Sequence, residues 1–165
     1  MAQVEEESFR TSILYWLRVF EERSNTEFVR VMGGGKSLVA RWRTLSILAE
    51  LSGLTINDLT RHTQIERTAL SHLLTQMEKE ELIRREPYPN DRRIIGVHLT
   101  EAGHTMFEHM LPVRRHIFRE AAEGIPEEDL EAMLKITRKL VDNLDRIAGM
   151  PPKRDAETPE DQANA

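Results

Sequence analysis

The 165-residue chain contains no cysteine, which excludes disulfides, thiolate-bound metals and the sensing of oxidants through a thiol. It also has no apolar run near the roughly 20 residues that a membrane-spanning helix needs. The first nine residues, MAQVEEESF, lack the basic and apolar stretch of a secretory signal. We therefore expect a cytoplasmic location, and we expect any signal to be received through non-covalent binding.

Residue arrangements typical of enzymes are missing as well. Gly35-Lys36-Ser37 matches the end of a phosphate-binding loop, but the first glycine of that loop would fall on Arg30, within a helical pattern where the loop requires a strand. His109 and His116 lie two turns apart on one predicted helix, yet their spacing supplies no third metal ligand. We predict no catalytic activity, no cofactor and no metal, and we expect Ser37 to cap the following helix.

Charge is unevenly distributed along the chain. The net charge of −5 argues against a general nucleic-acid binder, but not against a local binding site. Acidic residues cluster at 5–7, 127–129 and 155–161, whereas the segment 61–93 is rich in arginine. We therefore expect a dipolar molecule with a basic side toward DNA, and binding that weakens steeply with salt.

The segment 66–80 predicts a helix with two different faces, since it holds no glycine or proline. Its apolar residues recur at spacings of three and four, which places them on one face: Leu70, Leu73, Leu74 and Met77. The outer residues are mostly hydrogen-bond donors, with no carboxylate among them: Arg67, Thr68, Ser71, His72, Thr75 and Gln76. A surface that contacts phosphates and base edges needs such donors. An ordinary amphipathic helix with a solvated face has the same pattern, so this segment alone leaves both interpretations open.

The next segment predicts a β-hairpin with a charged tip. Residues 82–86 and 94–99 have strand patterns, and the prolines with Asn90-Asp91 between them predict a turn. Arg92 and Arg93 fall at the tip, where a guanidinium can reach a narrow minor groove. Free Asp91 would repel phosphate, so we expect it to hold an arginine in one orientation. A solvated turn with a weak local ion pair is the alternative.

A shorter helix precedes this unit at 55–62. Thr55 is the expected N-cap, and Asp58 occupies the position of its capping-box partner. Thr63-Gln64 then connects to the helix at 66–80. Helix, tight turn, helix and hairpin are the layout of a winged helix-turn-helix. A module of this layout binds DNA or, as the acidic net charge allows, another protein.

The run 54–103 resembles the MarR family of bacterial transcriptional regulators. The likeness rests on MEKEELIRR at 77–85, on the Asp-Arg-Arg tip at 91–93 and on LTEAG at 99–103. It extends more weakly over residues 9–147. The chain departs from the family at Glu81, where glycine is usual. Glycine would supply a left-handed helix end at no steric cost, so Glu81 leaves open how this helix ends.

The resemblance implies a mainly α fold with a small β-hairpin wing, in which long N- and C-terminal helices form a two-fold dimer. It also implies a repressor that binds a pseudo-palindromic operator as a homodimer and is released by a small, often aromatic or phenolic, ligand. Two copies of the helix at 66–80 would then face successive major grooves, about 34–36 Å apart.

Individual residues can be assigned to these roles. We expect major-groove contacts from the outer face of the helix at 66–80: Arg67, Thr68, Ser71, His72 and Gln76. Arg93 matches the family's minor-groove arginine, Asp91 matches the acid that orients it, and Arg92 is expected at phosphate. The family's ligand pocket lies between the first, second and fifth helices and the DNA-binding unit. Four residues are candidates for it: Trp16, Arg41, Trp42 and His109.

These patterns divide the chain into segments. We expect an N-terminal tail (1–8), dimerisation helices (9–32 and 100–148), a winged helix-turn-helix DNA-binding region (37–99) and a disordered tail (149–165). The glycines at 33–35 should end the first helix, Pro112 should interrupt the helix at 100–122, and Pro126 should begin the last helix. Apolar stripes run along 9–32 and 126–147. Pairing between two chains would bury both stripes; packing within one chain is the alternative.

Overall fold

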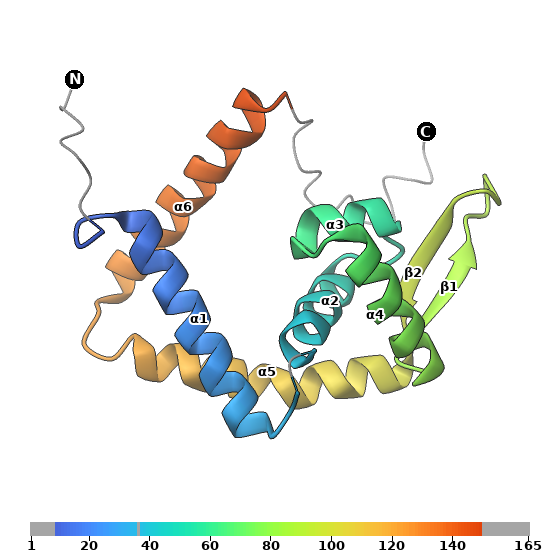
Figure 1. Cartoon of the computed structure of the whole chain (residues 1–165), viewed down its shortest axis with the longest axis horizontal. Coiled ribbons are helices and arrows are strands. Elements are labelled where there is room, and N and C mark those ends of the chain that lie inside the picture. The colour runs from blue at the N-terminus through green and yellow to red at the C-terminus, as the bar shows by residue number, and fades with distance from the viewer. Residues whose placement is uncertain (1–8, 36, 150–165) are drawn as a thin grey trace. The chain divides into compact units, whose positions relative to one another are not determined.

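The structure is a computed structural model of the chain, and it describes residues 9–35 and 37–149. The tails predicted at 1–8 and 149–165 lie outside these residues, apart from Gly149, as does Lys36 of the Gly-Lys-Ser match. The chain divides into two compact units, residues 1–120 and 121–165 (Figure 1). Within the described ranges, no helix combines the length and the apolar character that crossing a membrane requires.

The order of the elements confirms the predicted fold, which is mainly α with a small hairpin. The first unit contains α1 (Ile13–Met32), α2 (Leu38–Glu50), α3 (Ile56–Thr63), α4 (Arg67–Lys79), β1 (Ile83–Pro87), β2 (Ile95–Leu99) and α5 (Glu101–Ala121), whose last residue opens the second unit. The second unit contains α6 (Glu127–Ile147).

The first two helices show which local signals set a helix boundary. α1 begins after Ser12, whose hydroxyl accepts a hydrogen bond from the Tyr15 amide at 3.4 Å, so the helix starts later than the predicted Phe9. It ends at Gly33, which has a φ of 67°, as the glycine run predicted. Ser37 occupies the predicted N-cap position of α2, but its side chain does not cap the helix. Ser37 makes no capping hydrogen bond, because its backbone already has helical angles instead of the extended angles of an N-cap.

Pro112 and Pro126 behave differently from their predicted roles. α5 is not interrupted at Pro112, which lies inside a continuous helix. Pro112 is exposed, and so is Glu108, whose carbonyl loses its helical donor and can bond to water. Pro126 is the cap of α6, one position before the first helical residue, and its carbonyl accepts from the amides of Asp129 and Leu130 at 3.1 and 3.2 Å.

The core of the first unit lies between its helices and the inner side of the hairpin. α4 buries the face that its spacing predicted: Leu70, Leu73, Leu74 and Met77. Neighbouring elements contribute further buried residues: Phe28 from α1, Leu45 and Leu48 from α2, Leu59 from α3, Ile83 and Val97 from the strands, and Met110 from α5. The polar outer face of α4 is therefore attached to the body of the unit by the opposite, apolar side of the same helix.

The hairpin lies beside α4 (Figure 1) and has one more partner than expected. β1 and β2 are antiparallel, with a register that runs from Ile83 opposite Leu99 to Pro87 opposite Ile95. Each strand starts one residue later than predicted. Leu54, which precedes α3, forms a single bridge to Val97 and so adds a short third segment to the sheet.

The described part of the second unit consists of α6 and the residues that flank it. No residue of α6 is buried. Its apolar residues are among the most exposed of the molecule: Met133, Leu134, Ile136, Leu140, Val141, Leu144 and Ile147, with Ile147 at 79%. In the first unit, the N-terminal part of α1 is similarly exposed at Ile13, Leu14 and Trp16.

Candidate functional site

The outer face of α4 presents all five residues that the sequence assigned to the major groove. Arg67, Thr68, Ser71, His72 and Gln76 are exposed, and they lie opposite the buried apolar face of the same helix. The face therefore has the donors that phosphate and base edges require.

The start of α4 is stabilised by its own N-cap. The Glu66 carboxylate accepts from the amides of Thr68 and Ala69 at 2.8 and 3.0 Å. These backbone bonds, that from Thr68 first, lower the pKa of Glu66. The Glu66 carboxylate at the start of α4 is thus bonded to the backbone amides of the first turn, where the helix dipole favours a negative charge.

α3 and the turn after it fix the approach to α4. The predicted capping box is present: the Thr55 hydroxyl accepts from the Asp58 amide at 3.2 Å, and the Asp58 carboxylate accepts from the Thr55 amide at 3.3 Å. Gln64 ends α3 with a φ of 57°. Asn57 of α3 accepts a hydrogen bond from the Arg67 guanidinium, which orients this side chain at the first turn of α4.

The exit from α4 explains two of the motifs. Glu81 has a φ of 58°, so a glutamate adopts the left-handed conformation that the family usually gives to glycine. The Thr100 hydroxyl donates to the Glu81 carbonyl and accepts from the Gly103 amide at 3.1 Å. A Cβ on Gly103 would lie 2.0 Å from the Leu82 carbonyl oxygen, so only glycine fits. The LTEAG motif therefore clamps the start of α5 to the α4 exit.

The tip of the hairpin has the arrangement that the sequence predicted. Asp91 accepts from Arg93 through Nε at 3.0 Å and Nη2 at 3.1 Å, and also from the Arg93 amide at 3.0 Å. Bonding to the Arg93 side chain and then to its amide lowers the pKa of Asp91. The Arg93 side chain is 91% exposed. Asp91 therefore orients a guanidinium that points into solvent, and Arg92 beside it is exposed too.

Arg41, one of the four ligand candidates, is occupied by an ion pair within the protein. Its guanidinium forms a two-pronged contact with Glu80 at the end of α4, in which Nη2 lies 2.7 Å from Oε1. The bond to Arg41 is the main cause that lowers the pKa of Glu80. Glu80 also accepts from Gln76 at 3.1 Å. Arg41 therefore links α2 to the reading helix instead of offering a free charge to a ligand.

The other three candidates do not come together. Trp16 packs edge-on against Tyr15, and its indole N–H donates to the Arg10 carbonyl at 3.0 Å. His109 is exposed on α5. Trp42 is half-buried, stacks on Phe107 with a ring separation of 5.7 Å and contacts Phe28 at 5.9 Å.

Arg114 of α5 completes this aromatic cluster, and the sequence did not single it out. Its guanidinium carbon lies 4.1 Å from the centre of the Phe28 ring and 5.7 Å from that of Trp42. Nη2 donates to the Asn25 side chain at 2.6 Å, whereas the buried Nε has no hydrogen-bond partner within the described residues. Its spacing along α5 could have indicated that Arg114 is partly buried, since it shares a face with the buried Met110 and Ile117.

The electrostatic surroundings of Arg114 favour an anion. Burial and then the charge of Arg43 lower the pKa of Arg114, and Glu21 partly opposes this shift. Glu21 itself is paired with Arg43. The Glu21 carboxylate therefore bonds to Arg43 and not to Arg114, whose charge lies beside the rings of Phe28 and Trp42 with only a more distant influence of Glu21.

Comparison with known proteins places this geometry in a family. Residues 38–95 match the model of the MarR family. The HTH-type transcriptional regulator FarR of Neisseria gonorrhoeae is 30% identical over 102 residues, which are 62% of this chain and 70% of FarR. The chain belongs to the MarR family. It is therefore a DNA-binding transcriptional regulator with a winged-helix fold, in which β1 and β2 form the wing beside α4.

Two further similarities extend over most of the chain. The HTH-type transcriptional repressor IacR of Pseudomonas putida is 26% identical over 133 residues, covering 81% of this chain and 80% of IacR. The structure of Bordetella bronchiseptica BpsR, whose DNA binding is regulated by 6-hydroxynicotinic acid, superposes with a TM-score of 0.71 at 22% identity. This match covers 84% of this chain and 99% of BpsR, so the shared fold reaches beyond the winged helix.

Proposed function

We propose that this MarR-family protein is a homodimeric repressor that binds a pseudo-palindromic operator and is released by a small aromatic carboxylate. The observation that carries the proposal is the pairing of an exposed donor face on α4 with an exposed, acid-oriented arginine at the tip of the wing. These two features suit the major groove and the narrow minor groove respectively.

The dimer rests on the uncovered apolar stripe of α6. Burial of such a stripe yields roughly 25 cal/mol for each Å² of apolar surface, and a monomer would leave it in water. A second copy of the chain supplies a matching stripe, since a two-fold interface uses the same surface on both partners. The dimer then presents two copies of α4 to successive major grooves, about 34–36 Å apart.

Individual contacts follow from this placement. Arg67, Thr68, Ser71, His72 and Gln76 bind in the major groove, Arg93 enters the minor groove in the orientation that Asp91 sets, and Arg92 binds phosphate. Gln76 donates one N–H of its amide to Glu80, which leaves its second N–H and its carbonyl oxygen for a base edge.

The experiment that tests DNA binding uses the region upstream of the protein's own gene. Fluorescence anisotropy should show saturable binding that is at least about 1,000-fold tighter than to a shuffled duplex and that weakens steeply with salt. Equal binding to both duplexes would contradict the proposal. Absence of binding to either duplex would favour a winged-helix module that binds protein.

The effector site is the cluster around Arg114. A planar acid can stack beside Trp42 and Phe107 while its carboxylate bonds to the half-buried guanidinium of Arg114, whose buried Nε has no hydrogen-bond partner among the described residues. The related regulator BpsR responds to an acid of this class. Such a ligand releases DNA only if it binds the DNA-incompetent state more tightly than the competent one.

The effector assignment is tested with charged and neutral forms of one ligand shape. Anisotropy is recorded with 6-hydroxynicotinic acid, with 4-hydroxybenzoate and with the neutral 4-hydroxybenzamide. We expect at least one acid, but not the amide, to release the operator, and we expect Arg114→Gln to abolish the response. Arg115→Gln, at the exposed neighbouring position, is the matched control. An equal response to the amide, or an unchanged response of Arg114→Gln, would overturn this site.

A further inference from the structure

The wing needs support from the body of the protein. A two-stranded hairpin by itself is only marginally stable. Among the described residues, β1 and β2 form a two-stranded sheet, to which Leu54 adds a single bridge. The additional support comes from the turn between α2 and α3. The Gly53 amide donates to the Val97 carbonyl at 3.0 Å, and the Val97 amide donates to the Leu54 carbonyl at 2.9 Å.

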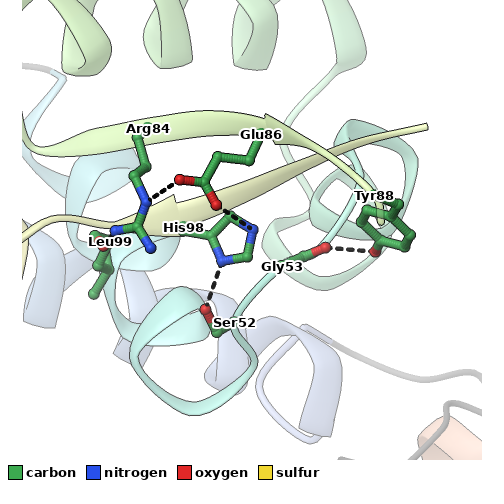
Figure 2. A network of polar contacts seen from close by, with 7 residues as sticks. All are labelled: Ser52, Gly53, Arg84, Glu86, Tyr88, His98 and Leu99. Atoms are coloured by element: carbon green, nitrogen blue, oxygen red, sulfur yellow. Dashed lines mark hydrogen bonds and ion pairs between the residues drawn. The ribbon is translucent and has the colours of Figure 1, made fainter. Parts of the chain in front are cut away.

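Tyr88 makes a second connection to the same turn. Its hydroxyl donates to the Gly53 carbonyl at 2.5 Å, as Figure 2 shows. Its ring lies over Gly96 of β2, where an added Cβ would approach the ring to 2.7 Å and the Gly53 carbonyl oxygen to 2.9 Å. A side chain at position 96 would therefore clash with the Tyr88 ring, which explains the glycine. Burial, and then the charge of Asp58, raise the pKa of Tyr88, so the phenol remains a donor at neutral pH.

His98 makes a third connection, on the same side of the wing (Figure 2). Its Nδ1 lies 3.0 Å from the Ser52 hydroxyl, and its Nε2 lies 4.0 Å from the Glu86 carboxylate of β1. Glu86 in turn accepts from Arg84 at 2.6 Å. The histidine thus joins β2 to Ser52, the residue that precedes Gly53, and its other ring nitrogen faces Glu86 of β1.

Tyr88 is also the point where the strand passes into the tip. Its amide donates to the Ile94 carbonyl at 2.9 Å, and the Ile94 amide donates to the Asp91 carbonyl at 3.0 Å. One residue therefore closes the loop that carries Arg93 and at the same time bonds to the body through its side chain.

We infer that Tyr88 and His98 form a latch, which fixes the wing to the Ser52–Gly53 turn and thereby positions Arg93 for its contact with DNA. The inference rests on the proposed minor-groove contact of Arg93. Tyr88 and His98 are positioning residues: they touch no DNA themselves, and they act through the orientation of the tip. Without the latch, the tip of the wing samples more orientations. Part of the free energy that Arg93 gains on binding DNA is then offset by the cost of ordering the tip.

A double-mutant cycle tests the latch in the full-length protein. Tyr88→Phe removes only the hydroxyl that bonds to Gly53, and Tyr15→Phe, at the other tyrosine of the chain, is the matched control. We expect Tyr88→Phe to weaken operator binding about 3- to 10-fold, with Tyr15→Phe unchanged. In an Arg93→Ala background, Tyr88→Phe should cause no further loss, because the residue it positions is gone.

The outcomes separate the latch from a general structural role. An equal loss in both backgrounds, or no loss in either, would overturn the inference. If Arg93→Ala alone leaves binding unchanged, both the wing contact and its positioning by Tyr88 are wrong.

A second measurement does not depend on DNA. Hydrogen exchange of the free protein should become faster at the amides of Tyr88 and Ile94 in Tyr88→Phe, with the amides of α4 unchanged. Unchanged exchange at the tip would contradict the latch even if DNA binding itself is confirmed, whereas faster exchange without any operator binding would support the latch and refute the proposed function.

Discussion

α4 and α6 have the same kind of sequence and opposite fates in the chain. Both are amphipathic, with apolar residues recurring at spacings of three and four. α4 buries its stripe against α2, α3 and the wing, whereas no residue of α6 is buried. The periodicity tells which residues form a stripe, but not whether the same chain covers it. Burial of the apolar stripe of α4 holds the polar face of that helix in a fixed position. The exposed apolar stripe of α6 instead favours burial against a second chain.

The comparison predicts that the core side of α4 is the most sensitive place in the molecule. Leu74 is fully buried, so Leu74→Ala removes apolar contacts and leaves a cavity that the surroundings fill only in part. We expect the free energy of unfolding to fall by about 2–5 kcal/mol, measured by urea denaturation at one protein concentration. Leu144→Ala on α6 is the counterpart. Its loss should shrink as the protein is diluted below its dimerisation constant, and an equal loss at every concentration would contradict the difference between the two helices.

A charge on the α6 stripe should break the dimer. Leu140→Glu places a carboxylate where the partner helix would bury it, and we expect dimer dissociation to increase by roughly 100-fold or more. Analytical ultracentrifugation measures this change. Lys139→Glu introduces the same side chain on the other side of α6 and should leave the dimer intact. A dimer that tolerates Leu140→Glu would show that the interface lies elsewhere.

The wing tip should contribute to the affinity for DNA but not to the stability of the fold. Arg93→Ala should weaken operator binding by about 1–3 kcal/mol and reduce the slope of log affinity against log salt by roughly one. The melting temperature should not change, because the Arg93 side chain is exposed. Wild-type affinity in a gel shift would exclude the minor-groove assignment.

Most of the DNA-binding unit could be predicted because its signals are local. The capping box of α3, the apolar face of α4 and the Asp91–Arg93 pair all depend on residues within four positions of one another or on one helical period. The contacts that were missed join distant segments. Tyr88 and Gly53 are 35 positions apart, and the partners of Arg114 on α5 come from two other helices, α1 and α2. The ion pair of Arg41 was not predicted for the same reason, since its partner Glu80 lies 39 positions away.

The Arg41–Glu80 pair provides a smaller, pH-dependent test of how α4 is attached. Glu80→Gln removes the negative charge that compensates a nearly buried guanidinium, and we expect a loss of about 1 kcal/mol at neutral pH, moderated because Glu80 is partly exposed. Since the folded-state pKa of Glu80 is lowered, its contribution is present above its unfolded pKa, about 4.3, and is lost as pH falls through the folded value.

The measurement for this pair is urea denaturation of wild type and Glu80→Gln from pH 7 into the acid range. Their difference in unfolding free energy should shrink as the pH falls. The contributions of the other carboxylates with lowered pKa values, Glu27, Glu66 and Asp91, cancel in the difference. A difference that grows on acidification would contradict the pairing.

The smallest expected effect is a gain of stability at the exit of α4. Glu81 holds a left-handed conformation that costs a side chain about 1 kcal/mol and costs glycine little. Glu81→Gly should therefore stabilise the protein by about 0.5–1 kcal/mol, even after the greater flexibility of glycine in the unfolded chain is counted. Glu81→Ala removes the same charge but keeps the Cβ, and it should bring no gain. Equal melting temperatures for the two variants would show that strain at this position is negligible.

The central claim is that the uncovered stripe of α6 joins two DNA-binding units, and sedimentation equilibrium of the full-length protein tests it most directly. Over micromolar concentrations the account predicts a species with twice the 19.1 kDa mass of the chain, which Leu140→Glu converts to a single chain. A wild-type protein that sediments as one chain throughout this range, and still binds its operator with full affinity, would contradict it.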